Sequence, residues 1–143
     1  LLQEGCPGWM YQVKCGATTT WERWDALKPD GTVNEEKMAG SGDNMVSFNH
    51  YAFGSVGEFY YQYILGIKPQ KPGFAELHFE PYPDRRLGGV SGSYLSRAGK
   101  IESSWKYEED GCHISLNTPV KSEVVLPNGQ RETVEEGTYQ WLC

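Results

Sequence analysis

The second half of this chain contains three short turn signals that restrict it to an antiparallel β fold. Ala98-Gly99, Asp110-Gly111 and Asn128-Gly129 separate segments in which apolar and polar residues alternate. Such pairs favour the tight turns of β-hairpins, because glycine adopts the backbone angles that those turns need. Short strands joined by hairpins are typical of an antiparallel β-sandwich. The expected strands cover residues 74–80, 90–97, 100–107, 112–118, 121–126, 130–135 and 138–142.

The first part of the chain has helical patterns. Residues 7–14 predict a short helix, with a proline near its start and Gly16 just past its end. Ser47 is the expected N-cap of a second helix, which runs to about Leu65 and stops at Gly66. The apolar stripe of this second helix consists of Phe53, Val56, Tyr60, Tyr63 and Ile64.

Three segments of this first part predict loops. Thr18-Thr19-Thr20 is a β-branched run, which suits a loop or an extended entry better than a helix interior. Residues 28–32 contain a proline and a glycine in the positions that favour a turn. Residues 34–43 are polar with two glycines, and such loops commonly line the rim of a binding site.

The helical and alternating patterns meet in a stretch that suits neither a helix nor a strand. Gly66, Pro69 and Pro72 interrupt this stretch. We therefore predict an α+β chain of two parts. The division places a helical part in residues 1–70 and an antiparallel β-sandwich in residues 71–143.

The charge of the chain excludes one large class of partner. Its 143 residues have a formal net charge of −6. A nucleic-acid partner is not expected, because phosphate neutralisation needs a basic stripe and none is present. No membrane span is expected, because no apolar run approaches the ~20 residues that a spanning helix needs. The chain starts at Leu1 without Met or a signal peptide, so we expect a piece of a longer protein whose targeting signal lies upstream.

The four cysteines do not have the spacing of a metal site. Zinc sites commonly contain CxxC pairs, and this sequence has none. We therefore expect no metal, and no cofactor is indicated. Cys6 and Cys15 could form a disulfide within one loop-helix unit, whereas the alternative is that all four thiols, including Cys112 and Cys143, are free.

Two runs place charged and polar groups among large flat rings. They are Trp21-Glu22-Arg23-Trp24-Asp25 and Ser47-Phe48-Asn49-His50-Tyr51-Ala52-Phe53-Gly54. Aromatic faces cover the C–H side of a sugar ring, and a few fixed polar groups recognise its hydroxyls. A carboxylate beside a sugar is also the usual catalyst of glycoside hydrolysis. These runs are therefore compatible with a carbohydrate site, with Glu22 and His50 as candidate polar groups.

Each of these residues has a structural alternative. Glu22 could pair with Arg23 or Lys28 at the surface, and a positive neighbour would keep its carboxylate ionised. His50 could bond to a backbone carbonyl. The rings of Trp21 and its neighbour Trp24 could belong to an ordinary core. Arg23 and Asp25 are expected to orient the loop through hydrogen bonds.

Several runs together resemble the C-terminal region of bacterial α-L-rhamnosidases, which are glycoside hydrolases of family 78. The runs extend from Gly16 to Asp25, from Met45 to Gly54, from Gly66 to Pro69 and from Gly99 to Trp105. The tryptophan-glutamate-arginine-tryptophan run is the most specific of them. The resemblance extends through most of the chain.

The resemblance implies a fold and a reaction. The fold would be the last helices and loops of an (α/α)₆ barrel, followed by a β-sandwich that packs on it. The reaction would be hydrolysis of terminal α-L-rhamnosyl bonds with inversion, on rhamnose-containing glycosides or polysaccharides. Glu22 matches the general base, His50 a sugar contact, and Trp21 part of the sugar pocket. The general acid belongs to an earlier motif that this chain lacks, so the isolated chain is expected to be inactive. The source would be bacterial, and the location periplasmic or secreted.

The β part has two further interpretations. It could bind carbohydrate on an exposed aromatic platform made of Tyr94, Trp105 or Trp141, or it could only brace the barrel. Because Trp105 and Trp141 lie on predicted strands, we expect them in the core, which favours bracing.

Overall fold

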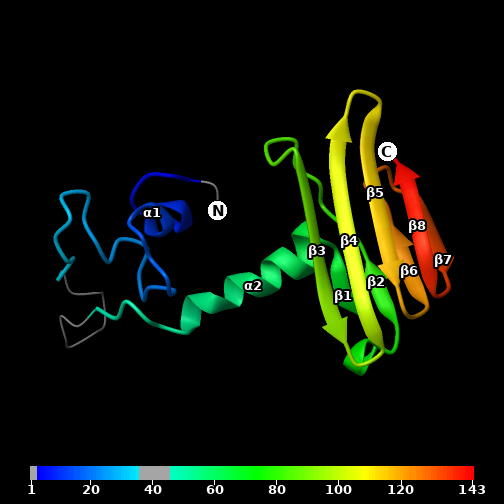
Figure 1. The fold of residues 1–143 in the computed structure, drawn as a ribbon, viewed down its shortest axis with the longest axis horizontal. Coiled ribbons are helices and arrows are strands. Elements are labelled where there is room, and N and C mark those ends of the chain that lie inside the picture. The colour runs from blue at the N-terminus through cyan, green and yellow to red at the C-terminus, as the bar shows by residue number, and fades with distance from the viewer. Residues whose placement is uncertain (1–2, 36–45) are drawn as a thin grey trace. The chain divides into compact units, whose positions relative to one another are not determined.

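The computed structural model describes residues 3–35 and 46–143, and the chain divides into two compact units (Figure 1). The first unit covers Leu1–Val56 and the second covers Gly57–Cys143. The predicted loop over residues 34–43 lies outside the described residues from residue 36 onward. None of the described helices is long and apolar enough to cross a membrane.

The first unit contains one short α-helix followed by loops. Helix α1, Trp9–Lys14, confirms the predicted helix over residues 7–14 and begins two residues later. It ends where Gly16 adopts a φ of 80°, in the left-handed region that glycine reaches without strain. The predicted turn is also present, because the Lys28 N–H donates to the Thr32 carbonyl at 2.8 Å.

The predicted second helix is confirmed from Ala52 onward, but its predicted start at Ser47 is wrong. Three consecutive segments follow: η1 Ala52–Ser55, α2 Val56–Phe59 and η2 Tyr60–Ile64. The hydroxyl of Ser47 accepts the Asn49 N–H at 3.2 Å, so Ser47 lies in a turn. Its backbone carbonyl bonds to the N–H of Glu22, which keeps this stretch out of the helix.

The last helical turn is wide, and it stops at the predicted glycine. The Leu65 N–H donates to the Tyr60 carbonyl at 2.9 Å, a five-residue spacing typical of a π turn. Gly66 has a φ of 73°. A Cβ atom at Gly66 would lie 2.3 Å from the backbone nitrogen of Pro81, so no larger residue fits there.

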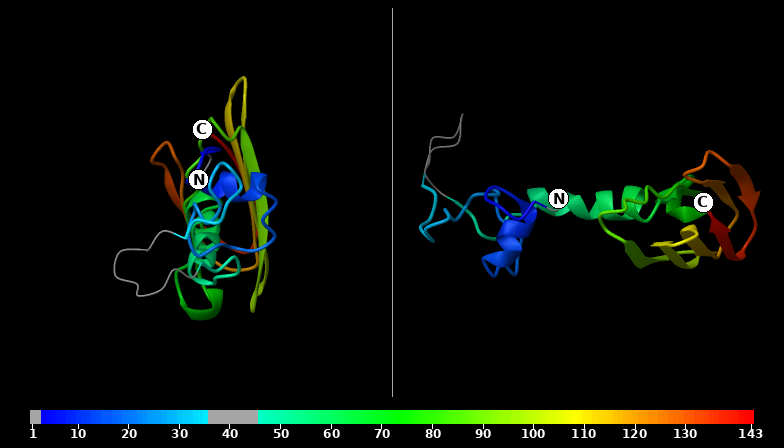
Figure 2. Two further views of the ribbon diagram at one scale, coloured as in Figure 1. Left: turned by 90° about the vertical axis from the view of Figure 1, so that its left-hand side faces the viewer. Right: turned by 90° about the horizontal axis from the view of Figure 1, so that it is seen from above.

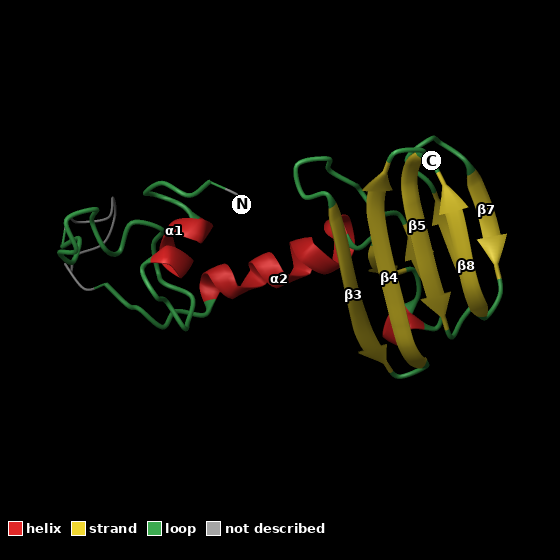
Figure 3. Ribbon diagram, turned by 45° about the horizontal axis from the view of Figure 1, so that its top comes forward, coloured by secondary structure: helices red, strands yellow, loops and turns green. Residues whose placement is uncertain are grey.

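Two four-stranded sheets form the second unit (Figures 1 and 3). One sheet has the order β1-β2-β6-β7, and the other has the order β3-β4-β5-β8. Viewed along the sheet edges, the hairpin β6–β7 lies on one side and β3 and β4 lie on the other (Figure 2). The strands are β1 Ile67–Pro69, β2 Leu77–Phe79, β3 Gly89–Ser96, β4 Gly99–Glu108, β5 Gly111–Thr118, β6 Ser122–Val125, β7 Arg131–Val134 and β8 Gly137–Leu142.

The seven predicted strands are all present, but the predicted junction is wrong in one respect. Ile67 pairs with Phe79 and Pro69 pairs with Leu77, so the first residues of the junction form strand β1. Proline is tolerated there because β1 is an edge strand, where every second residue directs its backbone N–H away from the neighbouring strand. The later part of the junction contains the short 3₁₀ turn η3 Pro72–Phe74.

A wholly antiparallel sandwich is also not what the structure shows. Strands β2 and β6 pair in parallel, with Leu77 opposite Ser122 and Phe79 opposite Val124. Parallel neighbours need a long crossover connection, and here strands β3, β4 and β5 of the other sheet supply it. All other strand pairs are antiparallel.

The core of the second unit lies between the two sheets. Strand β4 alternates, with Ile101, Ser103 and Trp105 buried and the residues between them turned outward. This alternation satisfies the period of two that the sequence predicted. The buried members of the core cluster are Leu65, Ile67, Leu77, Phe79, Ile101, Trp105, Cys112, Ile114, Leu116, Val124, Leu126 and Val134.

Two side chains of β4 bond to the residues that end the helical run. The indole N–H of Trp105 donates to the Ile64 carbonyl at 2.7 Å. The hydroxyl of Ser103 donates to the Leu65 carbonyl at the same distance of 2.7 Å. These bonds satisfy carbonyls that a helix end leaves unpaired, so they connect η2 to the sheet.

Candidate active site

Two segments that are far apart in the sequence lie side by side in the first unit. The His50 N–H donates to the Thr20 carbonyl at 2.8 Å, and the Glu22 N–H donates to the Ser47 carbonyl at 2.9 Å. The Thr19 hydroxyl adds a bond to the Phe48 carbonyl at 2.6 Å. The two predicted site runs therefore form one paired structure, which brings the segments of Glu22 and His50 together.

The carboxylate of Glu22 is held by the segment opposite it. Its Oε2 accepts the Ser47 N–H at 2.8 Å, and the side chain is half-buried. With the backbone bond in the other direction, Glu22 and Ser47 bond reciprocally. The second oxygen, Oε1, has no hydrogen-bond partner among the described residues, so one oxygen is oriented and the other is available for chemistry.

The imidazole of His50 has a defined tautomer. Its Nδ1 lies 3.3 Å from the Ala52 N–H, which is a donor only, so Nδ1 must be the acceptor. In the neutral ring the proton is then on Nε2, which has no partner in the part of the chain that the structure describes. The ring stacks on Tyr51, with centroids 5.2 Å apart. His50 is thus oriented to donate a hydrogen bond from Nε2.

Arg23 and Asp25, which were both expected to orient the loop through hydrogen bonds, bond to each other. Arg23 Nε donates to Asp25 Oδ1 at 2.7 Å, and its second bond reaches Oδ2 at 3.0 Å. The amide of Asn34 also donates to Oδ2, at 2.9 Å. The bonds from the Arg23 guanidinium lower the pKa of Asp25. The carboxylate that Arg23 stabilises through these bonds is therefore that of Asp25.

The tryptophans of this unit differ in exposure. Trp21 is 3% exposed and meets Phe48 edge-to-face, with ring centroids 5.2 Å apart. Trp24 is 42% exposed and stacks on Phe53 at 5.6 Å. Trp9 on α1 packs against both members of that second pair. The sequence analysis did not include Trp9 among the candidate site residues. A large aromatic residue on a predicted helix could have indicated its packing role.

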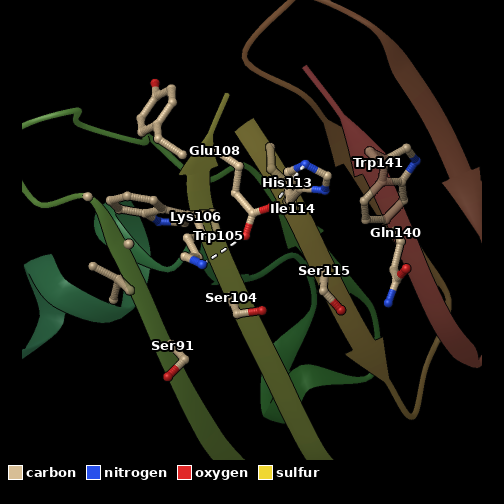
Figure 4. Close-up of a pocket in the computed structure, with 14 residues that line it drawn as sticks. Ser91, Ser104, Trp105, Lys106, Glu108, His113, Ile114, Ser115, Gln140 and Trp141 are labelled. Atoms are coloured by element: carbon tan, nitrogen blue, oxygen red, sulfur yellow. Dashed lines mark hydrogen bonds and ion pairs between the residues drawn. The ribbon is translucent and has the colours of Figure 1, made fainter. Parts of the chain in front are cut away.

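The second unit has a shallow hollow of about 740 Å³ on one face of the β3-β4-β5-β8 sheet (Figure 4). Ser91, Ser104, Ser115 and Gln140 project from four strands into it, beside the ion pair of Lys106 with Glu108. The predicted site residues Glu22, His50 and Trp21 are not among its lining residues.

The aromatic residues proposed as a sugar platform on the β part lie mainly in its core. Trp105 is 1% exposed. Trp141 is partly buried, stacks on Phe79 at 6.1 Å and donates its indole N–H to Glu132. Only Tyr94 is exposed, at 38%. The expectation of a core position is confirmed for Trp105, whereas Trp141 is partly buried and packs against the core.

One cluster of possible metal ligands exists among the described residues. Glu108, Asp110 and His113 lie at the β4–β5 turn, and their ligand atoms are within 4.8 Å of one another. All three are exposed, and His113 already bonds to Asp110 at 2.7 Å, which raises the pKa of the imidazole. The cysteines do not contribute, since all four are free thiols and Cys112 is buried.

Two domains of one known enzyme family match this chain, one in each part of the sequence. Residues 1–64 match the bacterial alpha-L-rhamnosidase 6 hairpin glycosidase domain, and residues 66–140 match the bacterial alpha-L-rhamnosidase C-terminal domain. An alpha-L-rhamnosidase of Alteromonas sp. (strain LOR) is 37% identical over 129 residues, which are 89% of this chain. One of Streptomyces avermitilis is 33% identical and is matched by 97% of this chain. The chain spans only 13% of the length of each of these two relatives.

Solved structures give the same assignment. The α-L-rhamnosidase of Aspergillus terreus superposes with a TM-score of 0.85 at 34% identity, covering 99% of this chain and 16% of that one. The Streptomyces avermitilis enzyme, complexed with L-rhamnose, gives a TM-score of 0.83 at 28% identity, covering 98% and 15%. The family matches, the relatives and the two folds agree, and the chain belongs to the bacterial α-L-rhamnosidase family.

Proposed function

We propose that this chain is the C-terminal part of an inverting α-L-rhamnosidase, and that Glu22 is its general base. The observation that supports this most is the reciprocal bonding between Glu22 and Ser47. It holds one carboxylate oxygen at 2.8 Å from a backbone N–H and leaves the other without a described partner. The bond at one oxygen also orients the other, because the carboxylate is planar. A general base needs an oxygen that is both oriented and accessible to take the proton.

The chemistry follows from the requirements of inversion. Glu22 removes a proton from a water molecule as the water oxygen attacks the anomeric carbon of a terminal α-L-rhamnosyl unit. A carboxylic acid on the other side of the bond protonates the departing oxygen. In inverting enzymes the two carboxyl groups stand roughly 6.5–9.5 Å apart, which leaves room for the water. We assign that acid to a segment that precedes Leu1 in the longer protein.

His50 is the proposed sugar contact, because its Nε2–H is directed by the bond at Nδ1 and can donate to a hydroxyl. The assignment of Trp21 to the sugar pocket stays a prediction. Because its ring is 3% exposed in this unit, we propose that it contributes by packing beneath the segment that carries Glu22.

The substrate class and the structural partner are part of the same proposal. The solved relative from Streptomyces avermitilis is complexed with L-rhamnose, which supports rhamnose-containing glycosides or polysaccharides as substrates. The 13% share of the relatives' length supports the rest of a catalytic barrel as the partner of this chain.

The division after residue 70 stays a prediction. The two family matches meet between residues 64 and 66, and strand β1 already belongs to the sheet. Both observations favour a division about five residues earlier, and the β-sandwich then includes β1.

The test is the substitution Glu22→Gln in the full-length protein, with an aryl α-L-rhamnoside as substrate. Turnover should fall by about 10²–10⁴-fold, because the amide cannot accept the proton of the water. Azide should restore part of the turnover, since this anion attacks without losing a proton. Glu4→Gln is the matched control, because Glu4 is exposed in the same unit and lies outside both site runs. Near-normal turnover of the Glu22→Gln protein would remove this residue from the role of base.

A further inference from the structure

Gln12 is a buried amide on helix α1. Its exposed fraction is 3%, on a helix where the next residue, Val13, is 61% exposed. Glutamine is mostly found at protein surfaces, since burial of its amide costs free energy unless both ends are hydrogen-bonded. Its position therefore requires a reason that apolar packing does not supply.

Gln12 holds both ends of the segment that leads to Glu22. Its backbone carbonyl accepts the Ala17 N–H at 3.0 Å. Its side-chain Oε1 accepts the Trp21 N–H at 3.3 Å. The bonded N–H belongs to the Thr20–Trp21 peptide, so the amide oxygen of Gln12 fixes the backbone one residue before Glu22.

The other end of the same amide is unsatisfied. Gln12 Nε2 is buried and has no hydrogen-bond partner among the described residues. A methionine of similar length would fill the same space without an unpaired donor. We therefore attribute the presence of an amide at this buried position to its oxygen Oε1, which accepts the Trp21 N–H.

We propose that Gln12 is a positioning residue that acts through the Trp21 peptide to hold the carboxylate of Glu22 in place. This inference rests on the proposed function, in which Glu22 is the base. Gln12 is 3% exposed and its described side-chain bond goes to the Trp21 N–H, so we expect it to act on catalysis through the geometry of Glu22. Displacement of a catalytic group by about 1 Å can cost about a hundredfold in rate.

The experiment is a double-mutant cycle in the full-length enzyme. Gln12→Met should lower kcat about tenfold to a hundredfold and leave KM unchanged, since the misplaced group acts in the chemical step. In the Glu22→Gln background the same change should lower kcat no further, because the base through which Gln12 acts is already absent. Val13→Ala on the same helix is the matched control and should leave kcat unchanged.

Two further measurements separate positioning from folding. Gln12→Glu keeps an acceptor for the Trp21 N–H and should recover a larger part of kcat than Gln12→Met. Hydrogen exchange at the Trp21 amide should become faster in Gln12→Met and remain slow in Gln12→Glu. This second readout does not depend on catalysis, so it also applies if the Met variant loses stability.

The outcomes distinguish this inference from the proposed function. If Glu22→Gln abolishes turnover but Gln12→Met does not change it, the positioning role is wrong and the function stands. An equal loss of kcat from Gln12→Met with and without Glu22 would assign Gln12 a merely structural role. Normal turnover of Glu22→Gln would overturn both proposals, and unchanged exchange at Trp21 would overturn the inference alone.

Discussion

In the unit Gly57–Cys143, apolar side chains from two sheets pack against one another, whereas the described part of Leu1–Val56 buries amides beside its few buried apolar groups. Gln12 and Asn34 are 3% and 4% exposed and bond to loop groups. We therefore expect the second unit to be the more stable of the two, because apolar burial is the main source of folding free energy. The first unit instead holds polar side chains in fixed directions through hydrogen bonds, as a binding or catalytic site requires.

The two units are also stabilised in different ways. The sheets are stabilised by a core that their own strands complete. The site segments are stabilised by hydrogen bonds between loops, and such regions open at a lower free energy than packed sheets.

The largest effect concerns the isolated 143-residue chain, which should not hydrolyse aryl α-L-rhamnosides. We propose that its first unit supplies only the base, whereas the departing oxygen also needs an acid, which we assign to the longer protein. The measurement is a rhamnosidase assay on the purified chain, with a Glu22→Ala chain as the control for contamination. Robust turnover that depends on Glu22 would show that the first unit is a complete site.

Trp105→Ala should destabilise the second unit by about 3–5 kcal/mol, since it leaves a cavity in the core and removes the bond to Ile64. Trp105→Phe keeps most of the volume and should cost less. Trp24→Ala, at a 42% exposed position of the first unit, is the comparison. Denaturant unfolding measures all three. An equal loss at Trp24 and Trp105 would contradict the contrast between the units.

Gly66→Ala should destabilise the chain by about 2–5 kcal/mol, the sum of left-handed backbone strain and a steric clash. The clash arises because the new Cβ would lie 2.3 Å from the backbone of Pro81. Gly31→Ala is the matched control, with a φ of 82° and no atom within 4 Å, so it should cost only about 1–2 kcal/mol. Comparison of the two denaturation midpoints decides whether the clash contributes.

The smallest effect is the pH dependence that Asp25 adds to the first unit. The bonds from Arg23 lower the pKa of Asp25 in the folded chain below its unfolded value of about 3.9. The stabilisation is therefore complete above that value and is lost as the pH falls through the folded pKa. Asp25→Asn should flatten this loss, measured by hydrogen exchange of residues 17–35 at about pH 3 and pH 7. Identical pH dependence in both proteins would exclude the pair as its source.

Local signals predicted the second unit well. Asn128-Gly129 and the other two turn pairs determine where hairpins form, because turn geometry depends on two or three neighbouring residues. The stop at Gly66 followed from the same kind of local preference, and its φ of 73° confirms it. The strands were therefore predictable to within a few residues.

The family and the site residues were also visible in the sequence as runs, but their partners were not. Ser47 had the residue type of an N-cap, yet its backbone pairs with Glu22, 25 residues away. The acceptor for the Trp21 N–H is a glutamine on a separate helix. Residue types do not predict which distant backbone N–H a side chain will bond, because every residue except proline has one.

The sequence alone was enough to predict the hairpin turns, the alternating strands, the end of the helical run and the α-L-rhamnosidase family. The structure was needed to show that Ile67–Pro69 joins a sheet, that β2 and β6 run parallel, and that Glu22 bonds to Ser47. The physical reason is the range of the interactions. Turns and alternation depend on neighbours in the chain, whereas a strand's partner and the direction of a side chain depend on segments that folding brings together.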